Sequence, residues 1–382
     1  GSGKTTLFRL LTNKEAIESG RIVVPKDFTF SCLEQHLSFS QKTILEEAIH
    51  NMTCEEWEKE YRAETVLFGL GFKKEDMNKD PRELSGGYQL RVHLAKVLFS
   101  DASCLLLDEP TNYLDIVSIR WLKKFLKSWN GSFIIISHDR EFLDSVSNHT
   151  IGLHRTKIYK IKGGTNNLFK LILQEEEHYE ASRLNIEKKR EHMESFVKRF
   201  GAKASKASQA KSKQKALDKI QALEQLTRLH SLKFNFNEKP FSGKKILTSE
   251  NISFSYNMED DSDLIKNLSL TIEKGEKIAI VGKNGYGKST ILKLLSKELK
   301  SNSGSLSISE NASIGYFGQT NIDRLDPSST ILEEIISVNP ALNIGEVRRI
   351  CGIMMFKKSD VDKKVSILSG GEKSRVLLGK IL

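Results

Sequence analysis

The chain of 382 residues is long enough for two or three domains, and a composition of 38% hydrophobic and 28% charged residues is that of an ordinary globular protein. A net charge of +10 suits a polyanionic partner such as nucleic acid, although overall charge is a weak guide. No stretch approaches the roughly 20 consecutive apolar residues of a membrane-spanning helix. Four irregularly spaced cysteines favour neither a disulfide framework nor paired CxxC metal sites, which indicates a reducing, cytoplasmic setting.

The sequence opens inside a glycine-rich motif and stops inside an expected helix, so we expect both natural ends of the protein to lie outside it. Glycines in a phosphate loop let backbone N–H groups surround phosphates, while the lysine neutralises charge and the next hydroxyl binds Mg²⁺. The opening motif fits the end of such a loop, against the alternative of a glycine-rich turn, and its residues are Gly1, Ser2, Gly3, Lys4, Thr5 and Thr6.

Further along, the apolar run 105–107 predicts a strand that ends in two carboxylates, Asp108 and Glu109. Asp108 is placed to reach Mg²⁺ and Glu109 to polarise an attacking water, which is the Walker B arrangement. Carboxylates at a strand end are usually solvated and a lone histidine is usually structural. A second predicted strand, 133–136, precedes His138, and from that position the imidazole can sense a γ-phosphate.

A long segment from about Asn167 to Leu232 contains no proline and one glycine, Gly201, and predicts two helices that reverse near that glycine. Between Arg183 and Lys233 there are 14 Lys or Arg and 5 Asp or Glu, so most of the net charge lies here. Charge runs are usually solvated helix faces. Dense cations between small Ala and Ser residues favour RNA binding instead, and the candidates are Lys198, Arg199, Lys203, Lys206, Lys211 and Lys213.

The second half predicts strands at 251–256 and 268–272, then a buried strand at 277–281 that leads into a complete GxxxxGK[ST] phosphate loop. A helix is expected from about Lys288. The loop and the first residues of that helix supply the candidate ATP-binding residues Gly282, Asn284, Gly285, Gly287, Lys288, Ser289 and Thr290, of which Ser289 is also a candidate Mg²⁺ ligand.

The two halves repeat each other at an offset of 284 residues. This offset relates the two phosphate loops, Gln35 to Gln319, and Ser85 in LSGGYQ to Ser369 in LSGGEK. Because three motifs repeat at the same offset, the two halves are predicted to be homologous domains, called cassettes here. Each serine-glycine-glycine group opens a predicted helix whose N-terminus stabilises anionic phosphate, and the residues are Ser85, Gly86, Gly87, Ser369, Gly370 and Gly371.

The order of these motifs resembles the ABC ATPase superfamily: Walker A, Q-loop, signature, Walker B, D-loop and switch histidine. The resemblance implies that Gln35 and Gln319 contact magnesium and water, that Asp115 lies in the D-loop, and that Tyr256 stacks on adenine. An aromatic residue in an alternating strand is more often part of a core, so Tyr256 has that alternative. ATP and Mg²⁺ are the implied ligands.

The resemblance also implies that the cassettes pair within one chain around two composite ATP sites. One site would combine the first phosphate loop and Walker B with the second signature, and the other the second phosphate loop with the first signature. The residues of the first are Lys4, Thr5, Gln35, Asp108, Glu109 and His138 with Ser369 to Gly371, and those of the second are Lys288, Ser289 and Gln319 with Ser85 to Gly87.

Residues 196–213 resemble the interdomain linker of ABC-F proteins, soluble twin-cassette ATPases that act on ribosomes, and TNYLD at 111–115 resembles the TNHLD of that family, with Tyr113 in place of histidine. The resemblance implies binding of rRNA and tRNA and a role as a translation factor or a ribosome-protection protein. The alternatives are an ATP-binding component of an ABC transporter and a DNA-repair or chromosome ATPase. A projecting cationic hairpin disfavours the former, and the absence of inserted zinc modules or very long coiled coils disfavours the latter.

We therefore predict an α/β protein with two P-loop ABC-type nucleotide-binding domains joined by a long α-helical hairpin. The expected boundaries are 1–164 for the first cassette, 165–240 for the basic linker and 241–382 for the second cassette.

Overall fold

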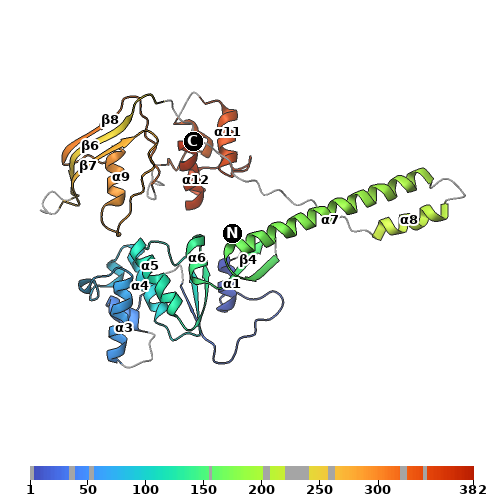
Figure 1. Cartoon of the computed structure of the whole chain (residues 1–382), viewed down its shortest axis with the longest axis horizontal. Helices are drawn as coiled ribbons and strands as arrows, with labels where there is room; N and C mark the ends of the chain where they lie inside the picture. Colours follow the sequence, from blue (N-terminus) through green and yellow to red (C-terminus); the bar gives the residue numbers. More distant parts are fainter. Residues whose placement is uncertain are drawn as a thin grey trace. The chain divides into compact units, whose positions relative to one another are not determined.

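The structure is a computed structural model that describes residues 4–33, 39–50, 56–154, 157–200, 207–219, 241–256, 263–318, 325–338 and 342–382. The chain forms two compact units, residues 1–228 and 229–382. The first unit contains a cassette core and the linker helices, and the second unit contains the other cassette (Figure 1).

A three-stranded parallel sheet forms the centre of the first unit, in the order β1-β2-β3, with β1 at Phe30–Cys32, β2 at Cys104–Asp108 and β3 at Ser132–Ile136. Leu105 and Leu107 face one hydrophobic core, whereas Leu106 faces a second core that includes Phe8 of α1 (Lys4–Leu11). Because both faces of β2 are covered, its sequence is apolar without alternation. The two strands predicted around 105–107 and 133–136 are confirmed.

Helices surround this sheet and supply most of the larger core. Their bounds are α2 Ile44–Ile49, α3 Glu56–Gly69, α4 Gly86–Leu98, α5 Ile116–Ser128 and α6 Arg140–Val146, with 3₁₀ turns at Lys74–Asp76 and Pro81–Glu83. The helices begin at polar caps: Thr43 caps α2 in a reciprocal capping box with Glu46, and Asp115 caps α5 by accepting the N–H groups of Val117 and Ser118.

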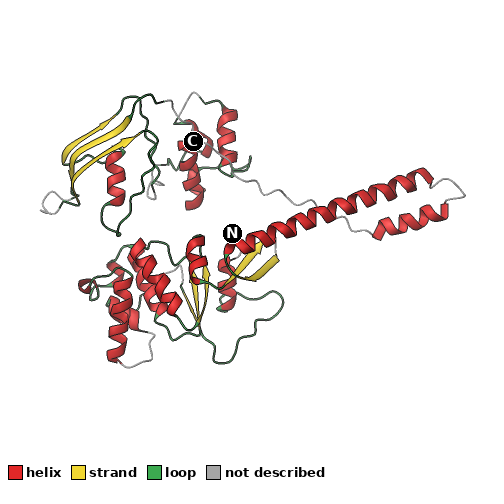
Figure 2. Cartoon of the chain, in the orientation of Figure 1, coloured by secondary structure: helices red, strands yellow, loops and turns green. Residues whose placement is uncertain are grey.

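The linker starts from a β-hairpin, β4 (His149–His154) paired antiparallel with β5 (Lys157–Lys162). Helix α7 (Thr165–Phe200, 36 residues) contacts this hairpin at its base, and α8 (Ala207–Lys219) packs beside α7 (Figure 2). The first predicted long helix is therefore confirmed by α7, and α8 supplies 13 residues of a second helix, while the predicted reversal at Gly201 and residues 220–240 lie outside the described residues. No helix in the described part of the chain is long and apolar enough to span a membrane.

The second unit has an antiparallel sheet in the order β7-β6-β8, with β6 at Lys245–Phe254, β7 at Ile265–Glu273 and β8 at Ser303–Ile308. Helix α9 (Lys288–Leu295) packs on it through Leu294, which joins Ile252, Phe254 and Ile265 in one core. The predicted strands at 251–256 and 268–272 and the helix from Lys288 are confirmed, with shifted ends.

A helical subdomain follows, made of α10 (Ile331–Ile336), α11 (Ile344–Ile353), a 3₁₀ turn at Val365–Ile367 and α12 (Gly370–Ile381). Its core is separate from that of the sheet and includes Ile331 and Val376, which are both fully buried. Thr330 and Glu333 form the same capping box at α10 that Thr43 and Glu46 form at α2. The internal repeat is therefore visible in local structure as well as in motifs.

The predicted buried strand at 277–281 is wrong for this structure. These residues form no strand, and Val281 has 75% of its surface exposed. A strand of this type needs neighbours that pair with its backbone N–H and C=O groups and helices over both faces. Among the described residues of the second unit, no strand runs beside 277–281, so the apolar run has no ladder to join.

Candidate nucleotide site

Asp108, at the end of β2, lies next to the first phosphate-loop helix. The hydroxyl of Thr5 on α1 donates a hydrogen bond to Asp108 Oδ2 at 2.9 Å. This contact brings together a hydroxyl and a carboxylate from residues 103 positions apart in the chain. Hard oxygen donors of this kind fit Mg²⁺, which takes few protein ligands alongside phosphate oxygens and water. The donor set therefore fits the metal that the sequence predicts.

Glu109 occupies the turn immediately after β2 in a left-handed conformation, with φ of 49°. Such a conformation costs of order 1–3 kcal/mol for a residue with a side chain and is concentrated at functional sites. The backbone N–H of Glu109 donates to Ile136 O at 2.8 Å, which fixes the turn to the end of β3. The Glu109 Oε1 atom is buried and has no hydrogen-bond partner among the described residues.

His138 follows β3 and lies beside Glu109. Its Nε2 atom is 3.4 Å from Glu109 Oε1, and its backbone N–H donates to Glu109 Oε2 at 3.3 Å. The imidazole is 85% exposed, whereas the Glu109 side chain is 21% exposed. A half-buried carboxylate beside an accessible histidine can hold and orient a water molecule for attack on a phosphate.

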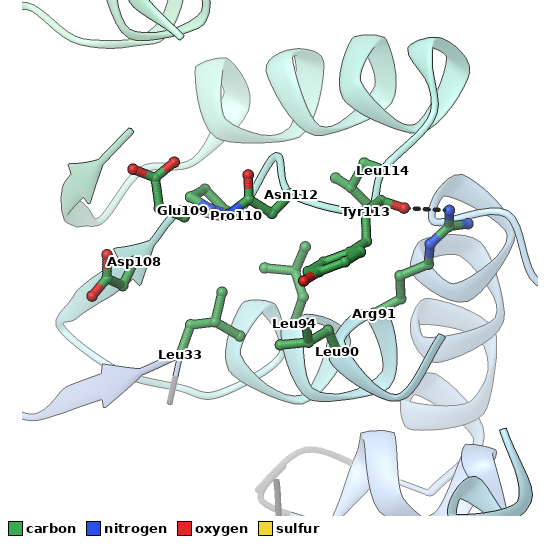
Figure 3. Close-up of a pocket in the computed structure, with 10 residues that line it drawn as sticks. All are labelled: Leu33, Leu90, Arg91, Leu94, Asp108, Glu109, Pro110, Asn112, Tyr113 and Leu114. Atoms are coloured by element: carbon green, nitrogen blue, oxygen red, sulfur yellow. Dashed lines mark hydrogen bonds between the residues drawn. The ribbon is translucent and has the colours of Figure 1, made fainter. Parts of the chain in front are cut away.

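The loop after Glu109 lies over α4, the helix that begins at the LSGGYQ signature, and a pocket separates the two. Figure 3 shows this pocket with Asp108 and Glu109 at one side and Tyr113 over Leu90 and Leu94 of α4. Tyr113 also has a left-handed backbone, with φ of 65°. The predicted D-loop residue Asp115 is buried, and its carboxylate caps α5 at 2.9–3.1 Å from two backbone N–H groups.

Arg91 connects this loop to the helical subdomain and was not anticipated from the sequence. It is 2% exposed, and its guanidinium donates to Tyr113 O at 2.7 Å (Figure 3). It also donates to Leu70 O at 2.8 Å. Burial lowers the pKa of Arg91, although not enough to discharge it. In the second unit Arg375, 284 positions later, donates in the same way to Met354 O at 3.1 Å.

Replacing Arg91 by Lys is expected to loosen the D-loop, because an ammonium cannot donate to both carbonyls in the geometry of a guanidinium. Losing one partner of a buried hydrogen bond costs about 1–3 kcal/mol. Native-state hydrogen exchange of the full-length protein should show faster exchange for amides 111–115. The exposed Arg120 on α5, changed to Lys, is the matched control and should leave exchange unchanged. Unchanged exchange in Arg91→Lys would contradict this role.

The second phosphate loop is curled around its own lysine. Lys288 Nζ donates to Gly282 O at 2.8 Å, to Lys283 O at 2.7 Å and to Asn284 Oδ1 at 3.3 Å. Gly285 has φ of 84° and the N-cap Gly287 has φ of 80°, which a residue with a side chain would adopt at a cost. Lys288 thus lies at the centre of the loop, where a phosphate would be neutralised.

Tyr256 lies at the end of β6, and its hydroxyl is 3.3 Å from the hydroxyl of Thr290 on the first turn of α9. Its ring packs edge-on against Phe254 and remains 61% exposed. The residue therefore belongs to the surface beside the phosphate loop rather than to the core. Ser289, the candidate metal ligand, is exposed at the same helix end.

The two signature motifs begin helices as predicted, α4 after the N-cap Ser85 and α12 after the N-cap Ser369. A Cβ atom built on Gly86 or Gly370 would meet nothing within 4 Å, so the space at both helix ends is open. Ser369 donates to Glu372 Oε2 at 2.7 Å, and this hydrogen bond is the main reason that the pKa of Glu372 is lowered. Ser85 makes no such cap bond.

Several predicted site residues lie outside the described residues, and the structure places none of them: Gly1, Ser2, Gly3, Gln35, Gln319, Lys203 and Lys206. Of the other predicted RNA-binding residues, Lys198 and Arg199 are exposed near the end of α7, and Lys211 and Lys213 lie on α8.

In each cassette a largely buried ion pair joins the signature helix to another helix, and neither pair was predicted from the sequence. Glu47 of α2 is fully buried and lies 2.5 Å from Lys96 Nζ on α4, and it accepts the backbone N–H groups of Ser40 and Gln41 at 2.8 Å each. Its counterpart in the second unit joins Glu334 to Lys380, and Glu334 accepts the Asp326 N–H at 2.7 Å. The paired residues lie 49 and 46 positions apart in the chain, so no local sequence pattern indicates that they pair.

Comparison with known families agrees with this geometry. A family model described as "ABC transporter" matches residues 1–112 and 265–382, and a second model with the same description matches residues 151–236. The chain belongs to the ABC family of ATP-binding proteins. Its relatives include a member of the ABC transporter F family, consistent with an ABC-F ATPase.

Among curated proteins, the chain is 32% identical over 427 residues to the ATP-binding protein YdiF of Bacillus subtilis, covering 100% of this chain and 66% of that protein. It is 31% identical over 437 residues to ABC transporter F family member 5 of Arabidopsis thaliana, covering 100% of this chain and 62% of that protein. The chain thus spans less than two thirds of the length of these relatives.

Among solved structures, the chain is similar to archaeal ribosome recycling factor aABCE1 in its complex with the ribosomal stalk protein aP1. The TM-score is 0.58 at 19% identity, covering 99% of this chain and 62% of that one. The structure of an RNase-L inhibitor gives a TM-score of 0.56 at 18% identity, covering 99% of this chain and 62% of that one. At this identity the likeness shows the fold, two ABC cassettes in one chain.

Proposed function

We propose that the full-length protein is a cytoplasmic ATPase that acts on the ribosome, as a translation factor or a ribosome-protection protein. ATP binding would close the two cassettes and hydrolysis would reopen them, and this cycle would reposition the α7–α8 linker on rRNA and tRNA. Population of the closed state then depends on how much better ATP binds that state than the open one.

The contacts around β2 support the hydrolytic part of this proposal. Thr5 and Asp108 would hold Mg²⁺ at the first site, together with Gln35, and Glu109 would polarise the attacking water. The buried Oε1 of Glu109 accepts no hydrogen bond from the described residues, with His138 Nε2 3.4 Å away, whereas buried acceptors in native proteins nearly always accept one. A water molecule supplies that donor and is also the second reactant of hydrolysis.

The second site would use Lys288 and Ser289 with Gln319, and Tyr256 would stack on adenine. Each site would be completed by the signature of the other cassette, where an open helix N-terminus favours phosphate. In this arrangement Ser85, Gly86 and Gly87 serve the second phosphate loop, and Ser369, Gly370 and Gly371 serve the first.

The observation that carries the ribosome proposal is the charge of the linker. From residue 198 to residue 219 it has eight Lys or Arg and a single acidic residue, Asp218. In the described part, Lys198 and Arg199 are exposed at the far end of a 36-residue helix whose other end contacts the cassette. Exposed cations at the end of a long rigid support suit phosphate backbones at a distance from the cassette. The structural neighbour aABCE1 carries the name of a ribosome recycling factor, which accords with the proposal.

Co-sedimentation with ribosomes tests this proposal, using the full-length protein with Glu109→Gln to slow hydrolysis. We expect it to pellet with ribosomes when ATP is present and to remain in the supernatant without ATP. A variant with six linker cations changed to Gln should bind at least tenfold more weakly. Its affinity should also depend less steeply on salt, by about 0.7–0.9 in log–log slope for each phosphate that the linker no longer neutralises. The six positions are Lys198, Arg199, Lys203, Lys206, Lys211 and Lys213.

The matched control changes six exposed lysines of the cassettes to Gln, which alters net charge equally and should leave binding intact: Lys26, Lys73, Lys74, Lys124, Lys127 and Lys245. If both sets of substitutions weakened ribosome binding equally, the effect of the linker substitutions would be one of overall charge alone. If the protein stays in the supernatant with ATP and instead binds membrane vesicles, the transporter alternative takes the place of the ribosome proposal.

A further inference from the structure

We propose that helix α6 transmits the state of the Glu109–His138 centre to the linker helix α7, and that Asp144 is the positioning residue of this connection. The inference rests on the proposed function, because it assumes that His138 responds to the bound nucleotide. All the contacts that carry it lie within the first unit.

The first end of α6 is fixed to the candidate hydrolytic centre. Asp139 caps the helix by accepting the Phe142 N–H at 2.9 Å, and it directly follows His138 in the chain. Phe142 is fully buried in the main core of the unit. With only seven residues, α6 has no length over which to bend. A displacement of His138 therefore moves the whole helix.

The second end of α6 holds the first residue of α7. Asp144 uses both carboxylate oxygens: Oδ1 accepts the Thr165 N–H at 2.7 Å and Oδ2 accepts the Thr165 hydroxyl at 3.0 Å. Thr165 is 6% exposed, so its side of both bonds is shielded from water, while the Asp144 carboxylate itself is exposed. A Cβ atom at Gly164 would lie 2.9 Å from Asp144 Oδ1, and only glycine allows the carboxylate to approach this closely.

A second contact connects the same two helices one turn further along. The guanidinium of Arg140, at the start of α6, lies 4.3 Å from the ring centroid of Phe169 on α7. Thr165 and Phe169 are four residues apart and so lie on one face of α7. Two attachment points on one face fix the direction of the helix, whereas a single cap would leave it free to swivel.

The simpler interpretation is that Asp144 only caps α7 and stabilises it, as acidic residues at helix N-termini do. The two interpretations differ in one respect. A cap alone predicts lower stability when Asp144 is removed, with no change in how α7 responds to ATP. A connection predicts that α7 stops following the nucleotide even where the protein remains folded and binds ATP.

The experiment measures the distance between spin labels at Lys127 on α5 and Lys188 on α7, both exposed, in full-length protein labelled through unnatural amino acids. Lys188 lies 23 residues beyond Thr165, roughly 35 Å along the helix, so a tilt of about 10° moves the label by roughly 6 Å. We expect a shift of that order on adding ATP and Mg²⁺ to Glu109→Gln protein. Asp144→Ala should lose most of the shift while retaining ATP binding by equilibrium dialysis.

Glu141→Gln is the matched control, because Glu141 lies on the same helix with a side chain that is 91% exposed, and it should retain the full shift. Thr165→Val, which removes only the hydroxyl bond, should reduce the shift partially and guards against misfolding of Asp144→Ala. An unaltered shift in both Asp144→Ala and Thr165→Val would overturn the inference. Wild-type protein that hydrolyses ATP, combined with no shift in the Glu109→Gln protein, would also overturn the inference while leaving the ATPase proposal standing, whereas wild-type protein without ATPase activity would overturn the proposed function itself.

Discussion

Replacing Glu109 by Gln is expected to slow ATP hydrolysis by about 10²- to 10⁴-fold, the usual contribution of a general base. The amide keeps the shape of the side chain and its left-handed turn but cannot accept a proton from the attacking water. ATP binding should be unchanged, because the phosphate loop and the Thr5–Asp108 contact remain. Single-turnover hydrolysis by the full-length protein provides the measurement.

This measurement needs a background in which the other site is silent, and Lys288→Ala supplies it by removing the cation at the centre of the second loop. Glu141→Gln is the control for an exposed carboxylate and should hydrolyse ATP at the parental rate. A Glu109→Gln protein that retains more than about a tenth of the parental rate would exclude Glu109 as the base.

Replacing Glu47 by Ala is expected to destabilise the packing of α2 against α4 by up to about 3–5 kcal/mol, because it leaves the mostly buried ammonium of Lys96, 16% exposed, without its partner. It also removes the acceptor of the Ser40 and Gln41 N–H groups. Native-state hydrogen exchange can locate the effect, and the amides of α2 and α4 should exchange faster while those of the second unit are unchanged.

Two variants separate the ion pair from the side chain itself. Glu46→Gln changes an exposed neighbour and retains a residue that can serve in the capping box, so it should be nearly neutral. Glu47→Leu with Lys96→Met removes both charges and should recover most of the stability. If the single and double variants were equally unstable, the pairing would not be the source of the effect.

The ion pair of Glu47 and Lys96 makes the local stability of α2 depend on pH. Burial raises the pKa of Glu47, but hydrogen bonds from Lys96 and from the Gln41 and Ser40 N–H groups outweigh it, and the pKa is lowered overall. A lowered pKa in the folded state means that the stabilisation is complete above the ordinary Glu pKa of about 4.3 and is lost as the pH falls through the folded value. The local unfolding free energy of α2 should therefore fall in acid, and Glu47→Gln should abolish that dependence.

Much of the fold could be predicted from the sequence because its signals are local. The apolar run before Asp108 is a strand buried on both faces, and the signature motifs begin helices because serine and glycine suit N-cap positions. The helices of the linker could be predicted because charged and apolar residues recur at helical spacing over a segment without proline. These properties depend on neighbouring residues and survive without knowledge of the tertiary structure.

The prediction failed where a strand depends on partners. Residues 277–281 have the apolar pattern of a buried strand, but no described strand pairs with them. Conversely, the hairpin of β4 and β5 was not predicted, although Tyr159 to Lys162 alternate between apolar residues and lysine. Alternation with lysine on the outer face is typical of a two-stranded ribbon, and this pattern could have predicted β5.

The polar contacts that tie the site together could not be predicted, because they join residues distant in the chain. Arg91 reaches Leu70 and Tyr113, 21 and 22 positions away, and Asp144 reaches Thr165, 21 positions away. Each of these side chains would read as an ordinary surface charge in the sequence. Only the fold shows that both are paired and that Arg91 is buried.

Ribosome-dependent ATP hydrolysis tests the central claim most directly. The full-length protein should hydrolyse ATP slowly alone and at least several times faster with ribosomes, and the variant with six linker cations changed to Gln should keep the basal rate but lose the stimulation. Basal hydrolysis that ribosomes leave unchanged, or stimulation that survives in the linker variant, would contradict an ATPase whose cationic linker acts on the ribosome.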